Sequence, residues 1–327
     1  MTTLAVIGGG IAGRSLIYTL ANQKNDFSTI LWFESDSFAF SCTLHSTAVV
    51  APRGVSTGLS VLGDQISSGF NTFSDHVKTF HPQGVKLITQ WTLASEKIQS
   101  FKNRYPESRE VTEIFGVKLN TPHELAQEDA YLIEPATYLE WLWANSHDEK
   151  INRIEDFVIE VIGSEIKTQK GKNFQADKII FATGVNNYLW KDLFADSKLK
   201  HTKVVQGSYL EFDFDLNQKD FSVTLDGDNL IYHADNQKLL IGSTTSEVLH
   251  ELAPLHELKE IYSRIGQKLN FKLPEFESGK VLVGRREKAS KREAYILQSG
   301  SYYALGGFYK NGFSLALDQA QKLINQL

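Results

Sequence analysis

Residues Leu4–Leu16 read LAVIGGGIAGRSL, and this stretch decides the fold. An apolar run too short for a helix comes first, three glycines follow, and apolar residues then recur at helical spacing. We therefore expect a strand, a tight turn and a helix. In this G-x-G-x-x-G pattern Gly8 makes the turn, Gly10 lets backbone N–H groups approach a pyrophosphate, and Gly13 lets the helix pack closely on the strand.

The helix after the glycines presents its positive end to the ligand of the turn, so Ile11 and Ala12 are expected against a diphosphate. A second apolar run, Ser28–Phe33, ends in Glu34, which lies twenty-one residues after Gly13. A carboxylate at that spacing accepts hydrogen bonds from both hydroxyls of an adenosine ribose and disfavours a 2′-phosphate. The alternative is a solvated carboxylate at a strand end.

Size and composition limit the class of protein. The chain has 327 residues, 42% of them hydrophobic, which is enough for a large core and favours two domains. A net charge of −5 gives no general attraction to nucleic acid or membrane, so we expect neither as a partner. A single cysteine, Cys42, excludes an internal disulfide and a thiolate cluster, and no metal site is expected. With no membrane-length run and no signal-peptide pattern, this predicts a cytoplasmic protein.

The segment 35–63 is rich in Ser, Thr and Gly. At its centre, His45, Ser46 and Thr47 offer small polar groups that suit a phosphate or ribityl chain. An ordinary polar loop explains the same composition. The segment is therefore a candidate for cofactor contact.

The remaining chain alternates between helical and strand patterns. A strand-rich return near 157–181 ends in Ala182-Thr183-Gly184, whose small side chains allow close approach of a ligand or simply make a tight turn. The expected elements are a mainly helical stretch over 74–104 broken near Pro82, short strands at 113–117 and 131–133, a helix from Pro135, antiparallel strands at 203–212, 222–225, 230–233 and 239–241, a helix over 256–269, a strand at 280–283 before the basic run 284–292, and a last strand, glycine turn and helix from 302.

In this order, the segments resemble the D-amino acid oxidase (DAO) family of FAD-dependent oxidoreductases over essentially the whole chain. The resemblance rests on residues 8–13 with Glu34, on 182–184, on 207–210 and 240–244, and on GFYKNGFSL at 307–315. That last string is especially similar to glycine oxidases of thiamine biosynthesis, where a basic residue also precedes Asn-Gly.

The resemblance implies an α/β protein with a Rossmann-like FAD-binding domain and a substrate domain on a mixed or antiparallel sheet. Residues 1–75, 145–200 and 295–327 would form the FAD domain, and 76–144 and 201–294 the substrate domain. The implied FAD contacts are Gly8, Gly10, Ile11, Ala12, Gly13, Glu34, Ser35, His45, Ser46, Thr47, Val158, Ala182, Thr183, Gly184, Gly307, Tyr309, Lys310, Asn311 and Gly312.

The C-terminal turn has its own chemistry in this interpretation. A helix that starts near Asn311 and Gly312 directs its amides at the flavin N1–C2=O edge, where reduction deposits negative charge. Lys310 would add to that field. The alternative is a surface turn with Lys310 in solvent.

In such enzymes an arginine binds the substrate carboxylate, often with the help of a tyrosine. Arg286 is the first candidate and Arg285 the second, and only one should face the site because neighbouring strand residues point to opposite faces. Tyr232 matches the family's tyrosine by position. A solvated charged loop and a half-buried strand aromatic are the alternatives.

Two features depart from the family or extend it. The family usually has proline after this arginine and an acid a few residues later, whereas this chain has Glu287 and Lys291. Some relatives that demethylate dimethylglycine bind their flavin through a histidine in the loop of His45. A covalent bond, a noncovalent contact or no involvement therefore remain open for His45.

These features predict oxidation of a small amine or amino acid, of glycine or N-substituted glycine type, by hydride transfer to flavin N5. Arg286, Tyr232 and Lys310 are the predicted catalytic residues. One alternative is an oxidoreductase that matures the wobble uridine of tRNA, since such a protein shares this fold and would show a basic RNA-binding face. Another is a non-catalytic FAD-binding protein. Oligomeric state and electron acceptor are not indicated.

Overall fold

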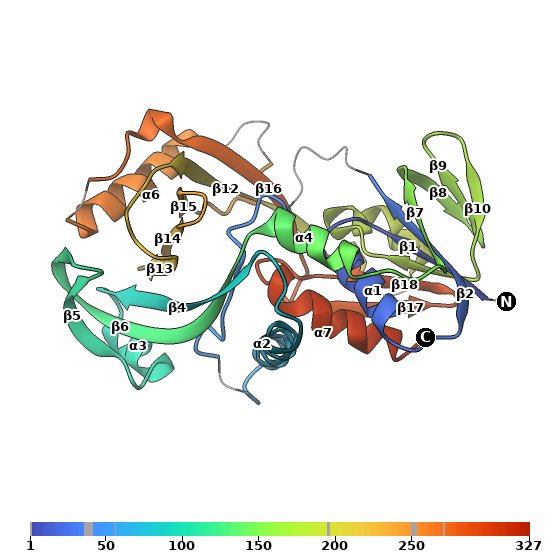
Figure 1. Cartoon of the computed structure of the whole chain (residues 1–327), viewed down its shortest axis with the longest axis horizontal. Helices are drawn as coiled ribbons and strands as arrows, with labels where there is room; N and C mark the ends of the chain where they lie inside the picture. Colours follow the sequence, from blue (N-terminus) through green and yellow to red (C-terminus); the bar gives the residue numbers. More distant parts are fainter. Residues whose placement is uncertain (1, 36–41, 56, 195–196, 250–253, 271) are drawn as a thin grey trace.

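The computed structural model describes residues 2–35, 42–55, 57–194, 197–249, 254–270 and 272–327. In this part of the chain two large sheets lie toward opposite ends of an elongated molecule (Figure 1). Segments from the start, middle and end of the chain build one sheet together. None of the described helices is long and apolar enough to cross a membrane.

The first sheet has six strands: β1 (Thr2–Ile7), β2 (Phe27–Glu34), β7 (Ile151–Glu155), β11 (Lys178–Phe181), β17 (Tyr295–Ser299) and β18 (Tyr302–Gly306). Their order is β17-β18-β11-β1-β2-β7, and only the edge strand β17 is antiparallel to its neighbour. Helices α1 (Ile11–Asn22) and α7 (Gly312–Ile324) cover one face. The small sheet β8 (Val158–Ile162), β9 (Glu165–Thr168) and β10 (Asn173–Gln175) packs on the other. Cover on both faces explains the continuous apolar runs.

The second sheet has nine strands: β3 (Val49–Val50), β4 (Val85–Ala94), β5 (Arg109–Ile114), β6 (Val117–Ile133), β12 (Lys203–Asp213), β13 (Phe221–Leu225), β14 (Asp228–His233), β15 (Lys238–Gly242) and β16 (Lys280–Lys288). The order is β16-β12-β15-β14-β13-β4-β6-β3, with β5 on β6, and only β13 and β4 pair in parallel.

The nine-stranded sheet carries a different cluster on each face. Helix α6 (Leu255–Lys268) covers one face, where Leu258 and Ile265 pack with Phe212 and Tyr232. The opposite face, called the inner face below, carries residues such as Tyr209, Ile231 and Leu240. The remaining elements are α2 (Val61–Phe80), α3 (Ile98–Arg104), α4 (Pro135–Ala144), α5 (Ser197–Lys200) and the 3₁₀ segments η1 (Gly184–Leu193) and η2 (Phe276–Ser278).

One element differs from its sequence prediction. The helical pattern expected over 74–104 is wrong for Val85–Ala94, which forms strand β4, and the helix before it starts earlier, at Val61. One face of β4 carries the buried Ile88, whereas the other face combines the buried Leu93 with Leu87, which is 65% exposed. An apolar residue at an exposed position interrupts the polar–apolar alternation of a strand, so the spacing of Leu87, Ile88 and Trp91 imitates a helix. The strand expected over 113–117 also differs, because β5 ends at Ile114, Phe115 and Gly116 form a turn, and β6 begins at Val117. The strand expected at 131–133 is the end of β6.

Helix α2 crosses α7 where a glycine allows the two backbones to approach. The helix begins after Ser60, whose Oγ accepts a hydrogen bond from the Gly63 amide at 3.0 Å. A Cβ added at Gly69 would overlap the carbonyl oxygen of Ser314. Gly69 therefore determines how closely α2 packs on the helix that begins at the C-terminal glycine turn.

We expect Gly69→Ala to lower the free energy of unfolding by about 1–3 kcal/mol, because the new methyl group meets rigid backbone. Gly266→Ala is the matched control. It also lies in a helix, but its nearest neighbour is the movable end of Leu273, at 3.3 Å. That variant should be unchanged or more stable by up to about 1 kcal/mol. Urea denaturation tests both, and a Gly69→Ala protein as stable as the wild type would contradict the packing argument.

Candidate active site

The two glycine turns of the chain lie side by side. Helix α1 begins after Gly10, and α7 begins after Asn311. A Cβ added at Gly312 would lie 3.4 Å from Cγ2 of Ile11, and Figure 1 shows the two helices next to each other. Two positive helix ends thus open on one place, which suits an anionic or electron-rich ligand.

The N-terminal turn depends on glycine for space. Gly8 has a φ of +133°, and a Cβ there would overlap the carbonyl oxygen of Ala182. A Cβ at Gly13 would overlap the carbonyl oxygen of Gly8. Ile11 and Ala12 are buried in the first turn of α1. The close approach that the motif predicts between turn, helix and strand β11 is therefore present.

Glu34 lies beside this turn, at the end of β2. It is 4% exposed, and a Cβ at Gly9 would lie 2.8 Å from its Oε2. Arg14 Nη2 bonds Oε2 at 3.1 Å, and Arg153 on β7 pairs with Oε1. The residue is a paired buried carboxylate rather than a solvated strand end. A ribose would share it with two guanidinium groups, and Arg153 was not found by sequence reasoning because β7 comes from far along the chain.

The segment 42–48 connects α1 with the nine-stranded sheet. Thr43 Oγ1 accepts a hydrogen bond from the Ile11 amide at 3.2 Å, and His45 Nδ1 lies 2.8 Å from the carbonyl oxygen of Val283 on β16. Ser46 Oγ accepts from the Ala48 amide at 3.1 Å, and Thr47 is half-buried. Ser35 follows β2, and residues 36–41 of the predicted loop lie outside the described residues. The loop thus brings His45 near the strand of Arg286.

The Ala182-Thr183-Gly184 return also lies at this place. The Ala182 amide donates to the carbonyl oxygen of Ile7 at 2.8 Å. The Thr183 amide and hydroxyl both donate to Oδ1 of Asn187, at 3.0 and 2.8 Å. Val158 packs in the core beside Ile7 and Phe33. Residues 182–184 are therefore hydrogen-bonded to the end of β1, just before the N-terminal glycine turn.

Arg286 faces the inner side of the nine-stranded sheet. It lies on β16 opposite Val205, and a Cβ at Gly207 would lie 2.5 Å from its Nη1. Its side chain therefore extends over Gly207, where the absence of a side chain makes room. Arg286 is 8% exposed, and Nη1 has no hydrogen-bond partner among the described residues. A buried guanidinium with a spare donor fits a carboxylate ligand. Arg285, one residue earlier, points to the other face.

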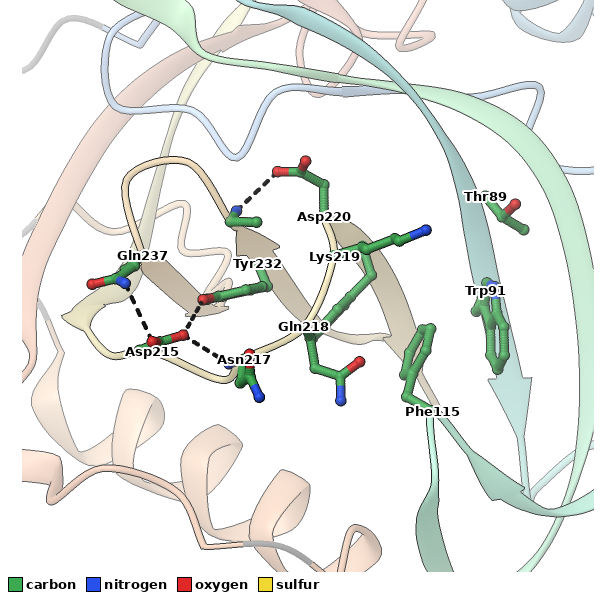
Figure 2. A pocket seen from close by; sticks show the side chains of 12 residues that line it. Thr89, Trp91, Phe115, Asp215, Asn217, Gln218, Lys219, Asp220, Tyr232 and Gln237 are labelled. Carbon is green, nitrogen blue, oxygen red and sulfur yellow. Dashed lines mark hydrogen bonds between the residues drawn. The ribbon is translucent and has the colours of Figure 1, made fainter.

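Tyr232 requires a correction. It lies on the α6 face, where its hydroxyl donates to Asp215 at 3.2 Å and accepts from the Leu216 amide at 3.2 Å. Figure 2 shows it in a pocket that Trp91 and Phe115 also line, and Arg286 is not among the lining residues. Sheet pleating puts neighbours on opposite faces, so position in sequence alone could not separate Tyr232 from Ile231.

Tyr209 lies on the inner face instead. It comes two residues after Gly207 on β12, so its side chain shares the face of Arg286. Burial raises the pKa of Tyr209, and the charge of Arg286 opposes that rise. The sequence did not single it out, although it stands in the 207–210 strand that carried the family resemblance.

Lys310 adds a second positive charge. Its Nζ donates to Thr245 Oγ1 at 3.0 Å. Desolvation, and then the positive charges of Arg286 and Arg53, lower the pKa of Lys310 to about 8. Arg53, which sequence reasoning missed, lies in a turn with a φ of +58° after β3. The cations therefore gather around the inner face near Arg286.

The comparisons with known proteins agree with this geometry. Residues 3–318 match the family model described as FAD dependent oxidoreductase, DAO. The chain belongs to the DAO family of FAD-dependent oxidoreductases. A search among curated proteins finds no match.

Several solved structures of this family have the same fold. Iminodiacetate oxidase from Chelativorans sp. BNC1 has a TM-score of 0.81 at 13% identity, over 98% of this chain and 94% of that chain. Glycine oxidase from Bacillus cereus ATCC 14579 gives 0.76 at 14%, over 100% and 94%. L-α-glycerophosphate oxidase from Mycoplasma pneumoniae, with FAD bound, gives 0.78 at 15%, over 99% and 95%. The predicted family, α/β fold class and FAD cofactor are confirmed.

The residues of this DAO-family chain fit FAD. The first turns of α1 and α7 lie side by side, with Gly312 beside the side chain of Ile11 and Gly10 beside Thr43. Asn311, 7% exposed at the start of α7, has a buried Oδ1 without a hydrogen-bond partner among the described residues. Across the same residues, no group of three or more His, Cys, Asp or Glu is placed to hold a metal ion.

The depressed pKa of Lys310 predicts a measurable coupling. Since Arg286 lowers it by like-charge repulsion, Arg286→Met should raise the pKa of Lys310 from about 8 toward its ordinary value of 10.5. Arg109→Met, which removes an exposed arginine on β5, should not. Lysine ¹³Cε shifts followed with pH, assigned with Lys310→Arg, measure this. An unchanged titration in Arg286→Met would place the two charges too far apart to interact.

Proposed function

We propose that this flavoenzyme oxidises a small amino acid or N-substituted glycine. The observation that carries the proposal is the buried guanidinium of Arg286, whose Nη1 is unpaired among the described residues on the inner face. An unsatisfied buried cation costs stability, which a carboxylate ligand would recover. FAD, held at the two glycine turns, would supply the two-electron oxidant for the substrate's C–N bond.

The side chains divide the work in this proposal. Arg286 binds the carboxylate in a two-pronged hydrogen bond, and Tyr209 on the same face takes the role first given to Tyr232. Lys310 and the amides at the start of α7 stabilise negative charge on the reduced ring. The FAD contacts predicted from the sequence remain proposals, with Glu34 already shared between two arginines.

The division into domains is also proposed. The six-stranded sheet would form the FAD domain from 1–75, 145–200 and 295–327, and the nine-stranded sheet the substrate domain from 76–144 and 201–294. The strand order supports this, because only β3 of the nine-stranded sheet comes from the first group of segments. The inner face then lies where the two domains meet.

The similar structures support an amine substrate, since an iminodiacetate oxidase and a glycine oxidase are among them. An activity on tRNA receives no support from the basic run 284–292. Through Lys288 the run is part of β16, Arg286 is buried, and Lys288 bonds Glu247 at 2.7 Å. A purely structural role for FAD would not account for the burial of Arg286 with a donor that has no hydrogen-bond partner among the described residues.

The first test is anaerobic reduction of the bound flavin by a panel of amino acids and N-substituted glycines. With the best substrate, Arg286→Ala should lower kcat/KM about 10- to 100-fold, because one charge-assisted pair is lost. Arg285→Ala, on the opposite face, should change it little. If no amine bleaches the wild-type flavin, the proposed activity is refuted. If the flavin of Arg286→Ala is reduced as fast as that of the wild type, the assignment of Arg286 to the substrate carboxylate is refuted.

The second test separates the two tyrosines. Tyr209→Phe should weaken binding of a carboxylate ligand by up to about tenfold, because it removes one hydroxyl from the inner face. Tyr232→Phe should leave that affinity unchanged and lower the free energy of unfolding by about 1 kcal/mol, through its bonds to Asp215 and Leu216. Ligand titration of the flavin spectrum and urea denaturation report both. The reverse pattern would restore Tyr232 to the site.

A further inference from the structure

Glu287, the residue after Arg286, is buried in a hydrogen-bonded cluster. It is 6% exposed. The Tyr295 hydroxyl donates to its Oε1 at 2.5 Å, and the Gly307 amide donates to its Oε2 at 2.9 Å. Asn187 Nδ2 lies 3.4 Å from Oε2. The carboxyl group of Glu287 is therefore hydrogen-bonded within the protein and is shielded from solvent.

The cluster joins the segments around the candidate site. Asn187 holds Thr183 of the return through its Oδ1. Gly307 begins the C-terminal glycine turn, and the carbonyl oxygen of Glu287 accepts from the Tyr309 amide of the same turn at 3.1 Å. Glu287 therefore bonds two residues of that turn, Gly307 and Tyr309, to the strand that carries Arg286.

The donors around Glu287 favour the ionised carboxylate. Asn187 Nδ2 lies 3.0 Å from the Tyr295 oxygen, so the Tyr295 hydroxyl accepts there and donates to Glu287. A proton on Oε1 would reverse the bond, because the carboxyl group would then donate to the Tyr295 oxygen and the Tyr295 hydroxyl hydrogen would lose this acceptor. A proton on Oε2 would compete with the Gly307 N–H. Protonation therefore changes the pattern of donors and acceptors in the cluster.

Only glycine fits at position 306, beside the carboxylate of Glu287. A Cβ at Gly306 would overlap Glu287 Oε2 and would lie 2.5 Å from Asn187 Nδ2 and 2.6 Å from the Tyr295 hydroxyl. Gly306 therefore leaves room for the Glu287 carboxylate, and Gly307 donates its amide to it.

We propose that Glu287 is a positioning residue, whose carboxylate holds the C-terminal glycine turn in register with Arg286 and so sets the distance between the flavin ring and the substrate carboxylate. It touches neither cofactor nor substrate and acts through Gly307, Tyr309 and the strand it shares with Arg286. The proposal rests on the proposed function in one respect, namely that Arg286 binds a carboxylate.

The cluster makes carboxylate binding depend on pH. Burial raises the pKa of Glu287 to about 7, against the opposing effect of its hydrogen-bond donors. Tyr295 of β17 is the titratable group that faces it, and burial raises its pKa further from neutrality. η1 contributes Asn187, and β18 and its turn contribute backbone groups, none of which ionise. Arg286 and Lys288, its neighbours on β16, point to the opposite face, whereas Arg285, two residues earlier, shares the face of Glu287 and is the nearest cation along that strand on this face.

Stability responds to pH in the opposite direction. Because the folded pKa of Glu287 lies above its ordinary value of 4.5, the folded protein holds this proton more tightly than the unfolded chain does. The contribution of Glu287 to stability therefore falls as pH rises from about 4.5 to about 7. Ligand affinity should rise over the upper part of that range, which separates a positioning role from a merely structural one.

The experiment uses the FAD-loaded full chain and acetate, which is ionised from about pH 6 to about pH 8. Acetate affinity is read from the flavin absorbance spectrum. In the wild type we expect affinity to fall severalfold as pH drops through about 7. Glu287→Gln should bind acetate about tenfold more weakly at about pH 8, with no such pH dependence, while its stability there is equal or higher. Hydrogen exchange of the amides at 306–311 should speed up in the same variant.

Two further variants complete the design. Tyr295→Phe removes one donor to the carboxylate, so the midpoint of the wild-type pH dependence should move to higher pH. Glu110→Gln, which changes an exposed carboxylate on β5, should behave as wild type. Acetate affinity and pH dependence in Glu287→Gln that equal those of the wild type would overturn the proposal. So would a Tyr295→Phe midpoint that does not move.

Failure of the proposed function would look different. If no amine reduces the flavin but acetate binding still follows Glu287, the substrate proposal is wrong and the positioning role is retained. If Arg286→Ala binds acetate as tightly as wild type at every pH, the carboxylate site lies elsewhere and both proposals are refuted.

Discussion

The structure depends on the close approach of two glycine turns that are almost three hundred residues apart in the chain. The N-terminal turn packs on Ala182 through Gly8 and on its own helix through Gly13. The C-terminal turn places the start of α7 against Ile11. Any side chain larger than hydrogen at Gly8 or Gly13 would meet backbone, so these contacts leave little freedom in how strand, return and helix are arranged. The two helix ends then create a positive region before any charged side chain is considered.

Charged side chains extend that region toward the nine-stranded sheet. Arg286 extends over Gly207, and Arg53 and Lys310 lie near enough for their charges to interact with it. Among the other buried charges, Glu34 pairs with Arg14 and Arg153, whereas Glu287 is held by neutral donors. Nη1 of Arg286 has no hydrogen-bond partner among the described residues, and in the proposed function it binds the substrate carboxylate. Lys310 and the amides at the start of α7 would then stabilise negative charge on the reduced ring.

Glu287 shows how the two regions are connected. Its side chain accepts hydrogen bonds from Gly307 of the C-terminal glycine turn and from Asn187, which also bonds Thr183. Its backbone is part of β16, the strand that carries Arg286. A carboxylate at this junction couples the geometry of the cofactor end to that of the substrate end through bonds of defined direction.

The sequence predicted the strand–turn–helix units at both ends, because glycine spacing and short apolar runs are local properties. The family and the FAD cofactor followed from the resemblance of several motifs in their order along the chain, and the family model confirms them. The same resemblance limited the proposed carboxylate-binding residue to Arg285 or Arg286. Only the tertiary structure decided which of the two faces the inner side, that Tyr209 and not Tyr232 shares that face, and that Val85–Ala94 is a strand. The physical reason is that a residue's face in a sheet follows from register with its neighbours, and that the exposed Leu87 interrupts the alternation by which β4 could have been identified as a strand.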